Sequence, residues 1–459
     1  MTKRRPAGPH RRPPQPQARS KAEVPATARD LAHRLLAGVL LRRRPLEQVL
    51  EDLNADAGRL EPRDRAFARA LATTVLRRRG ELDHVLNAFV ERPLPKEAGR
   101  VWMVLLTGAA QLLCLGTPAH AAVDTSVEAV RRLPGGARYA GLTNAVLRRV
   151  ADKGQSLLAQ TSGAGLDVPA WLRKRWEAAY GPGVATQIAE ASLREAPLDV
   201  SLKPGVGASD WAERLGGRVL PTGSVRLAAH GRIEELPGYE EGVWWIQDAA
   251  AALVARVLGD VSGKTVADLC AAPGGKTAGL AAAGATVTAV DISEKRLERL
   301  RLNLHRLSLT ADVIAADAAT WAPGHQFDAV ILDAPCTATG TIRRHPDILH
   351  LKIAQDVERM AGLQRQLLAN AAALVRPGGM LVYSTCSLEP EEGERQIEAF
   401  LAVNPAFQRQ PISAGELHAD PAWASPAGDL RILPHQLQLE TPELSGIDGF
   451  YVARLHRQD

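Results

Sequence analysis

Two cysteines, each placed shortly after an apolar run, are the residues of this chain best suited to chemistry. Cys336 follows the run at residues 330–332, and Cys386 follows the run at residues 380–383. A few apolar residues that end in turn-forming residues are typical of buried strands in a parallel sheet. A free thiol has a pKa of ~8.5, so only a few per cent is thiolate at neutral pH, yet that fraction is a strong nucleophile. If the two strands are neighbours, ~4.8 Å apart, both thiols can face one ligand.

The groups near Cys386 favour opposite states of its thiol. We expect a helix to begin near Pro390, and the positive end of its dipole would favour a thiolate at Cys386. The carboxylates of Glu389, Glu391 and Glu392 would oppose a thiolate. The sequence alone leaves this balance open.

Asp333 lies at the end of the first of these strands, so the two strand ends together offer two thiols and one carboxyl group. This set matches methyl transfer to carbon 5 of a pyrimidine, an atom too weakly nucleophilic to react unaided. A thiolate that adds to carbon 6 makes carbon 5 enamine-like. After the transfer, a base removes the proton from carbon 5 so that the thiol can leave, and an acid near nitrogen 3 stabilises the adduct. The pyrimidine has to leave its stack to enter such a pocket, which favours unpaired RNA as the substrate.

A glycine-rich turn follows another predicted strand, at residues 265–269. The turn consists of Cys270, Ala271, Ala272, Pro273, Gly274, Gly275 and Lys276. Backbone N–H groups at the start of the next helix suit a carboxylate-bearing ligand, and glycine lets that ligand come close. A phosphate-binding loop needs glycine at the position of Cys270, and a dinucleotide site needs G-x-G-x-x-G, so the turn matches neither.

Three aspartates follow three strands of the predicted sheet in register: Asp291, Asp317 and Asp333. Asp291 is placed to accept two ribose hydroxyls, and Asp317 to reach an adenine amino group. One acid at a strand end is more often a turn or cap residue, but three in register favour a ligand. A single nucleoside without a pyrophosphate matches S-adenosylmethionine better than NAD, so we predict S-adenosylmethionine as the cofactor.

The chain divides into four regions by its patterns. Residues 1–20 are predicted to be a disordered basic tail, and residues 21–155 have apolar residues at helical spacing, which predicts an all-α domain. Residues 156–240 are predicted to be a linker and a small α/β segment, either a spacer or part of a substrate cleft. Its Gly-, Ser- and Gln-rich beginning, at residues 153–165, is expected to be the linker itself. Residues 241–459 alternate strand and helix, which predicts an α/β Rossmann-like catalytic domain.

The basic charge is concentrated in the tail. The chain has a net charge of +5, but the first twenty residues hold six lysines and arginines and no acid, and without them 50 basic residues face 51 acids. The tail is therefore either an arm for RNA phosphates or a solubilising leader. Short arginine clusters also occur in the helical region, at residues 42–44, 77–79, 131–132 and 148–149. Each is either a phosphate contact or a charged helix face, and the sequence does not decide.

The cysteines and the apolar runs indicate a reducing compartment. Four cysteines without CxxC spacing argue against a disulfide framework and against a zinc site, so we predict no bound metal. The tail lacks the apolar segment of a secretory signal. The uncharged run at 101–123 is interrupted by glycine, proline and polar residues, which predicts a buried core helix rather than a membrane span. We expect a cytoplasmic protein.

Taken together, the motifs resemble the RNA (cytosine-5) methyltransferases. The resemblance rests on residues 333–336, 339–347, 384–387 and 270–276. It is closest to the bacterial RsmB (Sun/Fmu) branch, whose members methylate 16S rRNA and carry an N-terminal NusB-like domain. Residues 109–113, 118–123 and 142–148 look like that domain.

The resemblance implies a class I S-adenosylmethionine-dependent methyltransferase fold and separate roles for the two thiols. Cys386 is the implied nucleophile, Cys336 is the implied residue for product release, and Asp333 is expected to face both cofactor and target base. The turn at 270–276, Asp291 and Asp317 are implied to line the cofactor site. The implied partner is 16S rRNA not yet assembled into the subunit, bound by a monomer, with neither DNA nor a membrane as partner.

The chain departs from the family pattern in two places. Thr337 replaces the serine that usually follows the Pro-Cys pair, which is a mild change. Residues 201–203 read Ser-Leu-Lys where the family usually has Arg-Val-Asn, which puts RNA contacts there in doubt.

Two alternatives remain. A tRNA cytosine-5 methyltransferase would share the catalytic motifs, but such enzymes usually lack the NusB-like domain. A non-catalytic RNA-binding factor with a silent methyltransferase fold would have no need of Cys336 or Cys386.

Overall fold

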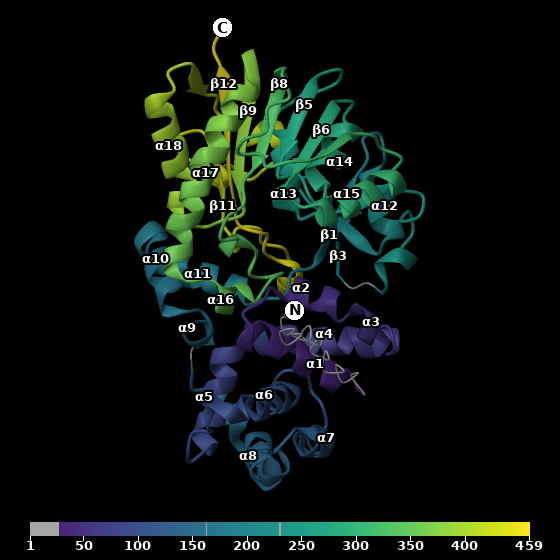
Figure 1. The fold of residues 1–459 in the computed structure, drawn as a ribbon, viewed down its shortest axis with the longest axis vertical. Coiled ribbons are helices and arrows are strands. Elements are labelled where there is room, and N and C mark those ends of the chain that lie inside the picture. Colours follow the sequence, from purple (N-terminus) through teal and green to yellow (C-terminus); the bar gives the residue numbers. More distant parts are fainter. Residues whose placement is uncertain (1–26, 162, 229–230) are drawn as a thin grey trace, which may run out of the picture.

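The computed structural model describes residues 27–161, 163–228 and 231–459. It consists of a helical domain, drawn in purple and blue at the bottom of Figure 1, and a larger domain with a central sheet above it. The basic tail predicted at residues 1–20 lies outside the described residues.

The N-terminal domain is helical, as its apolar spacing predicts. Its elements are α1 (Ala28–Leu36), η1 (Ala37–Leu41), α2 (Leu46–Asp52), α3 (Asn54–Ala57), α4 (Pro62–Arg77), α5 (Arg79–Phe89), η2 (Lys96–Ala98), α6 (Gly99–Leu113), α7 (Ala119–Arg132), η3 (Ala137–Tyr139) and α8 (Ala140–Leu158). Helix α6 is buried over most of its length and packs against α1, α4, α5, α7 and α8. The uncharged run at 101–123 therefore contains a core helix, as predicted. Among the described residues, no helix is both long and apolar enough to cross a membrane.

The prediction of a flexible linker at residues 153–165 is wrong. Helix α8 continues to Leu158, and a further short helix, α9 (Gly163–Asp167), follows. Gly154 is buried in α8, where a Cβ atom would lie 2.9 Å from Leu113 Cδ2 of α6. The glycine at this position allows two helices to approach closely, so it is a packing residue and not a source of chain flexibility.

The middle segment contains two helices and a small antiparallel sheet. Its elements are α10 (Ala170–Tyr180), α11 (Pro182–Ser192), β1 (Leu198–Leu202), α12 (Ala208–Arg214), β2 (Gly217–Val219), β3 (Val225–Leu227), η4 (Ile233–Glu235) and β4 (Trp244–Ile246), with strand order β2-β3-β1-β4. The sheet includes β4 and so extends past residue 240, the end predicted for this segment. Apolar side chains of α10 and α11, such as Trp176 and Ile188, pack with Ile342 and Leu388, which follow the two cysteines. The segment is thus a support for the loops that carry the thiols.

The C-terminal domain has the predicted Rossmann-like fold. Its elements are α13 (Ala249–Arg256), β5 (Thr265–Leu269), α14 (Gly275–Ala282), β6 (Thr286–Asp291), α15 (Glu294–Arg306), β7 (Asp312–Ala315), β8 (Phe327–Asp333), η5 (Thr339–Thr341), α16 (Ile348–Leu351), α17 (Ala354–Leu374), β9 (Val375–Thr385), η6 (Pro390–Glu392), α18 (Glu394–Val403), β10 (Phe407–Arg409), η7 (Gly415–Leu417), η8 (Pro421–Trp423), β11 (Leu430–Ile432), η9 (Pro442–Leu444) and β12 (Phe450–Arg457). The strand order is β10-β12-β9-β8-β5-β6-β7, with β11 paired to β12.

The order of the parallel strands places a ligand site at one edge of the sheet. Strands β5, β6 and β7 extend in one direction, and the chain then returns to add β8 and β9 on the other side of β5. The strand order therefore reverses between β5 and β8. In open α/β sheets, ligands bind at the carboxyl ends of the strands at such a reversal.

The helical domain docks on the segment that follows Cys336. Arg77 Nη2 donates to the carbonyl of Arg343 at 2.9 Å, and the Leu46 N–H donates to Asp347 Oδ2 at 3.0 Å. Arg78 and Arg79 pair with acids of α5. The arginine cluster at 77–79 thus makes intramolecular contacts, which favours the structural interpretation for this cluster over a phosphate contact.

Candidate active site

Strands β8 and β9 are neighbours, and they bring the two predicted thiols together. The parallel register places Asp333 opposite Ser384, and just beyond the strands Cys336 Sγ lies 3.5 Å from Cys386 Sγ. Both cysteines are half-buried, and neither is in a disulfide. The spacing allows both sulfurs to reach adjacent atoms of one small ring.

The Cys336 thiol is held in its protonated form. The hydrogen bond to Cys386, followed by burial, raises the pKa of Cys336 well above its ordinary value. Either sulfur can be the donor in the bond between the two thiols. A neutral Cys336 beside Cys386 is compatible with the separate roles that the family resemblance implies for the two thiols.

The helix predicted to begin near Pro390 begins later. A single 3₁₀ turn, η6, covers Pro390–Glu392, and α18 starts at Glu394. The helix cannot start earlier because the Glu392 carbonyl accepts hydroxyl bonds from Tyr383 and Thr385 of β9, at 2.8 and 3.2 Å, in place of helical N–H groups. The dipole argument for a thiolate at Cys386 therefore loses its basis.

The acidic residues near Cys386 are engaged elsewhere. Arg175 of α10 binds Glu389 at 2.5 Å and Glu391 at 2.6 Å. Glu392 is fully buried and binds the two thiol loops. The charges of Glu389 and Glu391 are thus compensated by Arg175, a partner that only the fold supplies, whereas Glu392 is held by neutral donors of the two loops.

Asp333 forms an ion pair that sequence reasoning did not predict. Its Oδ2 lies 2.6 Å from Lys276 Nζ, and its Oδ1 accepts the Ser384 hydroxyl at 2.8 Å. Burial lowers the pKa of Lys276, but the charge of Asp333, its hydrogen bond to Lys276 and the charges of Asp268 and Cys386 together outweigh burial and leave the pKa raised. Lys276 is therefore an ammonium that links the glycine-rich turn to the end of β8.

The glycine-rich turn leads from β5 into α14 as predicted. Gly274 has a φ of 101°, and a Cβ atom there would lie 2.8 Å from Leu300 Cγ. Gly275 is the first residue of α14, and the N–H groups in the first turn of this helix point out of its N-terminal end. Burial raises the pKa of Cys270 to about 12, so this thiol is protonated at neutral pH.

Asp268 is a buried acid of this turn that sequence reasoning missed. It lies on β5, its Oδ2 accepts the Thr277 hydroxyl at 2.6 Å, and burial raises its pKa to about 6. Its Oδ1 is buried and has no hydrogen-bond partner among the described residues. An acid within the apolar run at 265–269 was the signal that could have identified it.

Asp291 and Asp317 lie at the same sheet edge, with different environments. Asp291 is buried at the end of β6, accepts the N–H groups of Ala272 at 3.2 Å and Ser293 at 3.0 Å, and pairs with Arg296 at 3.2 Å. Asp317 is exposed and accepts the Ala319 N–H at 2.9 Å. The edge is assembled as predicted, but ribose binding by Asp291 remains a prediction because donors of the chain itself already occupy its carboxylate.

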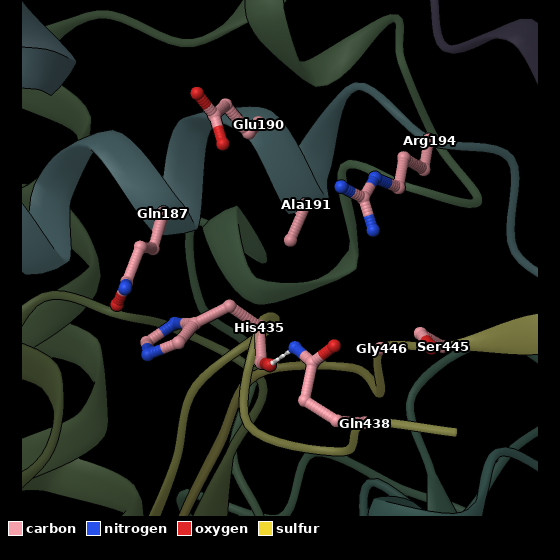
Figure 2. Close-up of a pocket in the computed structure, with 8 residues that line it drawn as sticks. All are labelled: Gln187, Glu190, Ala191, Arg194, His435, Gln438, Ser445 and Gly446. Atoms are coloured by element: carbon pink, nitrogen blue, oxygen red, sulfur yellow. Dashed lines mark hydrogen bonds between the residues drawn. The ribbon is translucent and has the colours of Figure 1, made fainter. Parts of the chain in front are cut away.

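Figure 2 shows a cavity elsewhere, between α11 and the loop that precedes β12. It is lined by Gln187, Glu190, Ala191, Arg194, His435, Gln438, Ser445 and Gly446. Its volume of about 120 Å³ is below the roughly 300–1,000 Å³ of common ligand sites. None of the predicted site residues, all of which are described, lines it. We therefore place the reaction at the sheet edge and not in this cavity.

The turn fits a nucleoside cofactor that bears an amino acid group. The N-terminus of α14 supplies N–H donors, Gly274 provides space, and Asp268 keeps a buried unpartnered oxygen beneath. A Rossmann-like sheet with such a turn and with acids at the following strand ends is the architecture of the S-adenosylmethionine-dependent methyltransferases.

Comparison with known proteins narrows this class. Residues 255–456 match the model of the 16S rRNA methyltransferases RsmB/F, and residues 26–152 match that of the NusB family. Proteins named ribosomal RNA small subunit methyltransferase B are similar over most of their length. The one from Xanthomonas campestris pv. campestris is 39% identical, covering 88% of this chain and 94% of its own. The one from Vibrio cholerae is 38% identical, and the match covers 88% of this chain and 92% of its own. The chain belongs to the RsmB/F family of rRNA methyltransferases.

Solved structures share the fold of the larger domain. A methyltransferase homologue from Pyrococcus horikoshii is 28% identical, with a TM-score of 0.51 over 62% of this chain and 93% of its own. NSun6 from the same organism has a TM-score of 0.53 at 19% identity, over 63% of this chain and 98% of its own.

Proposed function

We propose that this enzyme transfers a methyl group from S-adenosylmethionine to carbon 5 of a cytosine in 16S rRNA, through a covalent bond between Cys386 and carbon 6. The observation that carries the proposal is the 3.5 Å separation of the Cys336 and Cys386 sulfurs beside Asp333. Two sulfurs at this distance can act on neighbouring ring atoms in succession.

The first step is the attack of the Cys386 thiolate on carbon 6. Cys386 is the nucleophile that the family resemblance implies, and the sulfur 3.5 Å away, that of Cys336, has a raised pKa and stays protonated in the resting pair. Its lone pair forms the new S–C6 bond, and the electrons of the C5–C6 double bond become available at carbon 5. Asp333, oriented by Lys276 and Ser384, is placed to stabilise the ring near nitrogen 3.

The second step removes the proton from the methylated carbon 5. Once Cys386 is bound to carbon 6, its sulfur is a neutral thioether, so the interaction that raised the pKa of Cys336 most is gone. Cys336 then loses its proton more readily and can act as the base. The electrons of the C5–H bond restore the C5–C6 double bond, and the S–C6 bond breaks to release the Cys386 thiolate.

The cofactor supplies the methyl group on a positively charged sulfur. We propose that the turn at 270–276 holds its amino acid part and that Asp291 and Asp317 hold its nucleoside. Asp333 and Lys276 lie between this turn and the thiols. Binding of a ribose by Asp291 requires Arg296 to leave the carboxylate that it contacts here.

The variant Gly274→Ala is expected to weaken S-adenosylmethionine binding by about tenfold or more. A side chain at a φ of 101° is strained by ~1–2 kcal/mol, and 1.4 kcal/mol corresponds to a factor of ten. The new Cβ would also press on Leu300 and shift the turn. Isothermal titration calorimetry measures the change. Gly279→Ala is the matched control, because a Cβ there makes ordinary contacts. Equal affinities of the two variants would contradict the assignment of the turn.

The substrate follows from the family. The relatives are named for the small subunit of the ribosome, and unpaired RNA gives access to a flipped base. We propose that the enzyme acts as a monomer on 16S rRNA before the subunit is assembled. The NusB match in the N-terminal domain supports an RNA-binding role for that domain and disfavours the tRNA alternative.

Labelling of separate RNA substrates tests this proposal. The full-length protein is incubated with methyl-labelled S-adenosylmethionine and with protein-free 16S rRNA, assembled small subunits or tRNA in parallel. We expect labelled 5-methylcytosine in the protein-free 16S rRNA, with much less in assembled subunits. Label confined to tRNA would establish the alternative substrate, and no label in any RNA would refute the proposal.

A further inference from the structure

Each of the two cysteines is followed by a hydroxyl residue, and both hydroxyls bind the same buried carboxylate. Thr337 follows Cys336, and Ser387 follows Cys386. The Thr337 N–H donates to Glu392 Oε1 at 2.9 Å, and the Thr337 hydroxyl donates to Oε2. The Ser387 hydroxyl donates to the same Oε2 at 2.5 Å. Glu392 therefore joins the loop of one thiol to the loop of the other.

Further bonds tie this carboxylate to the frame of the site. Gln364 of α17 donates from Nε2 to Glu392 Oε1 and to the carbonyl of Pro335, both at 3.0 Å. The two hydroxyls of Thr337 and Ser387 lie 3.1 Å from each other. Glu392 and Ser387 are 0% exposed, so water does not compete for these bonds. A buried carboxylate with four donors is well satisfied and rigidly held.

We propose that Glu392 is a positioning residue that sets the spacing of Cys336 and Cys386. This inference rests on the proposed two-thiol reaction and adds a residue that acts on it through the two loops. The departure at Thr337 is explained in the same terms, since threonine and serine offer the same hydroxyl and backbone donors to Glu392.

The carboxylate also acts on the charge of one thiol. The titratable neighbours of Cys336 among the described residues are Cys386, Glu392 and Tyr383. The negative charge of Glu392 contributes to the raised pKa of Cys336, after the bond to Cys386 and burial. Loss of this charge is therefore expected to lower the pKa of Cys336, an effect that a purely structural residue would not produce.

The main test is Glu392→Gln. The amide has one accepting oxygen in place of two, so the Thr337 and Ser387 hydroxyls have to turn and accept from its NH₂ group. The stronger bonds to a charged carboxylate are lost, and the two loops are held less tightly. A misplacement of reacting groups by about 1 Å can lower a rate by ~10²-fold, and we expect kcat to fall by this order while the KM for S-adenosylmethionine is unchanged. Glu389→Gln is the matched control, because its buried carboxylate binds Arg175 and Trp176, and we expect its kcat to stay within about threefold of the parent. A Glu392→Gln kcat equal to that of the control would overturn the proposal.

A second measurement needs no RNA. Alkylation of Cys336 by iodoacetamide is followed by peptide mass spectrometry across a pH series in Cys386→Ala and in Cys386→Ala with Glu392→Gln. Because Cys386 is absent from both proteins, the difference reports Glu392 alone. We expect the midpoint to move to lower pH in the double variant. Coincident curves would overturn the electrostatic effect of Glu392 on Cys336.

A variant pair guards against a folding defect. If Glu392→Gln does not fold, Thr337→Val with Ser387→Ala removes both hydroxyl donors and leaves the carboxylate in place. We expect a kcat loss of similar order, with S-adenosylmethionine affinity retained as the sign of a folded protein. An unchanged kcat in this folded pair would overturn the proposal. If the parent protein itself methylates no RNA, the proposed function fails, while the alkylation curves still decide the role of Glu392.

Discussion

Replacing Cys386 with alanine is expected to reduce methyl transfer by at least ~10³-fold and to leave no covalent protein–RNA species. The nucleophile is the group without which the pyrimidine ring is not activated. Removal of Cys386 also removes the interaction that raises the pKa of Cys336 most, but burial and the Glu392 charge still raise it. In the proposed reaction Cys336 is placed to act on carbon 5 and not to attack carbon 6, so it does not replace the missing nucleophile.

Replacing Cys336 with alanine is expected to have the opposite effect on the covalent intermediate, which should accumulate as a stable protein–RNA adduct. Cys386 still attacks and the methyl group is still transferred, but the base that removes the carbon 5 proton is missing. The RNA then stays bound to Cys386. The product yield should approach one methyl group per protein molecule and then stop.

Denaturing gels with labelled RNA separate the two variants. A band that survives denaturation is expected for Cys336→Ala and not for Cys386→Ala, and peptide sequencing of that band should locate the RNA on Cys386. If an adduct formed in Cys386→Ala and not in Cys336→Ala, Cys336 would be the nucleophile and Cys386 the residue for product release. The trapped RNA would also identify the methylated nucleotide.

Replacing Arg226 with alanine is expected to destabilise the protein by ~3–5 kcal/mol. Arg226 of β3 and Asp199 of β1 are both fully buried, and two bonds of 2.7 Å join the guanidinium to the carboxylate. Nη1 of Arg226 also donates to the carbonyls of Leu444 at 2.7 Å and Gly446 at 2.6 Å. Its removal leaves a buried carboxylate without its partner, close to a second acid, Asp248.

Chemical denaturation measures this loss. Arg232→Ala is the control, since Arg232 is exposed and its ion pairs contribute little. The double variant Arg226→Met with Asp199→Asn should recover part of the stability, because neither charge is then buried alone. A loss below ~1 kcal/mol for Arg226→Ala would show that the small sheet does not depend on this pair. Such an outcome would also weaken the view that the middle segment supports the active-site loops.

Local sequence patterns were sufficient for most elements of the catalytic domain. The strands at 265–269 and 286–291, and Asp291 at the end of the second, lie where the apolar runs predicted. Strands β8 and β9, which precede the two cysteines, are neighbours, as the hypothesis that both thiols face one ligand required, and α17 lies in the crossover between them. These features depend on residues that are close in the chain, so apolar periodicity and turn-forming residues are sufficient to predict them.

Features that depend on partners distant in the chain were not predictable in this way. The glycine-rich stretch at 153–165 suggested a linker, but Gly154 is required where α8 packs on α6, a helix that lies far away in the sequence. Pro390 suggested a helix start, but hydroxyls from β9 bind the Glu392 carbonyl and delay the helix to Glu394. A glycine-rich stretch can be a flexible linker or a closely packed helix, and the element that packs against it decides which.

The sequence by itself determined the chemistry of this protein: two thiols and an acid at strand ends, a glycine-rich turn, and the family that these motifs identify. The tertiary structure decided how close these groups lie to one another and which partners they have. It placed the sulfurs 3.5 Å apart, paired Asp333 with Lys276, and buried Glu392 between the two thiol loops. A shifted pKa, an ion pair and a buried carboxylate all depend on the distances between atoms and on the exclusion of water. None of the three exists until residues from separate strands have come together.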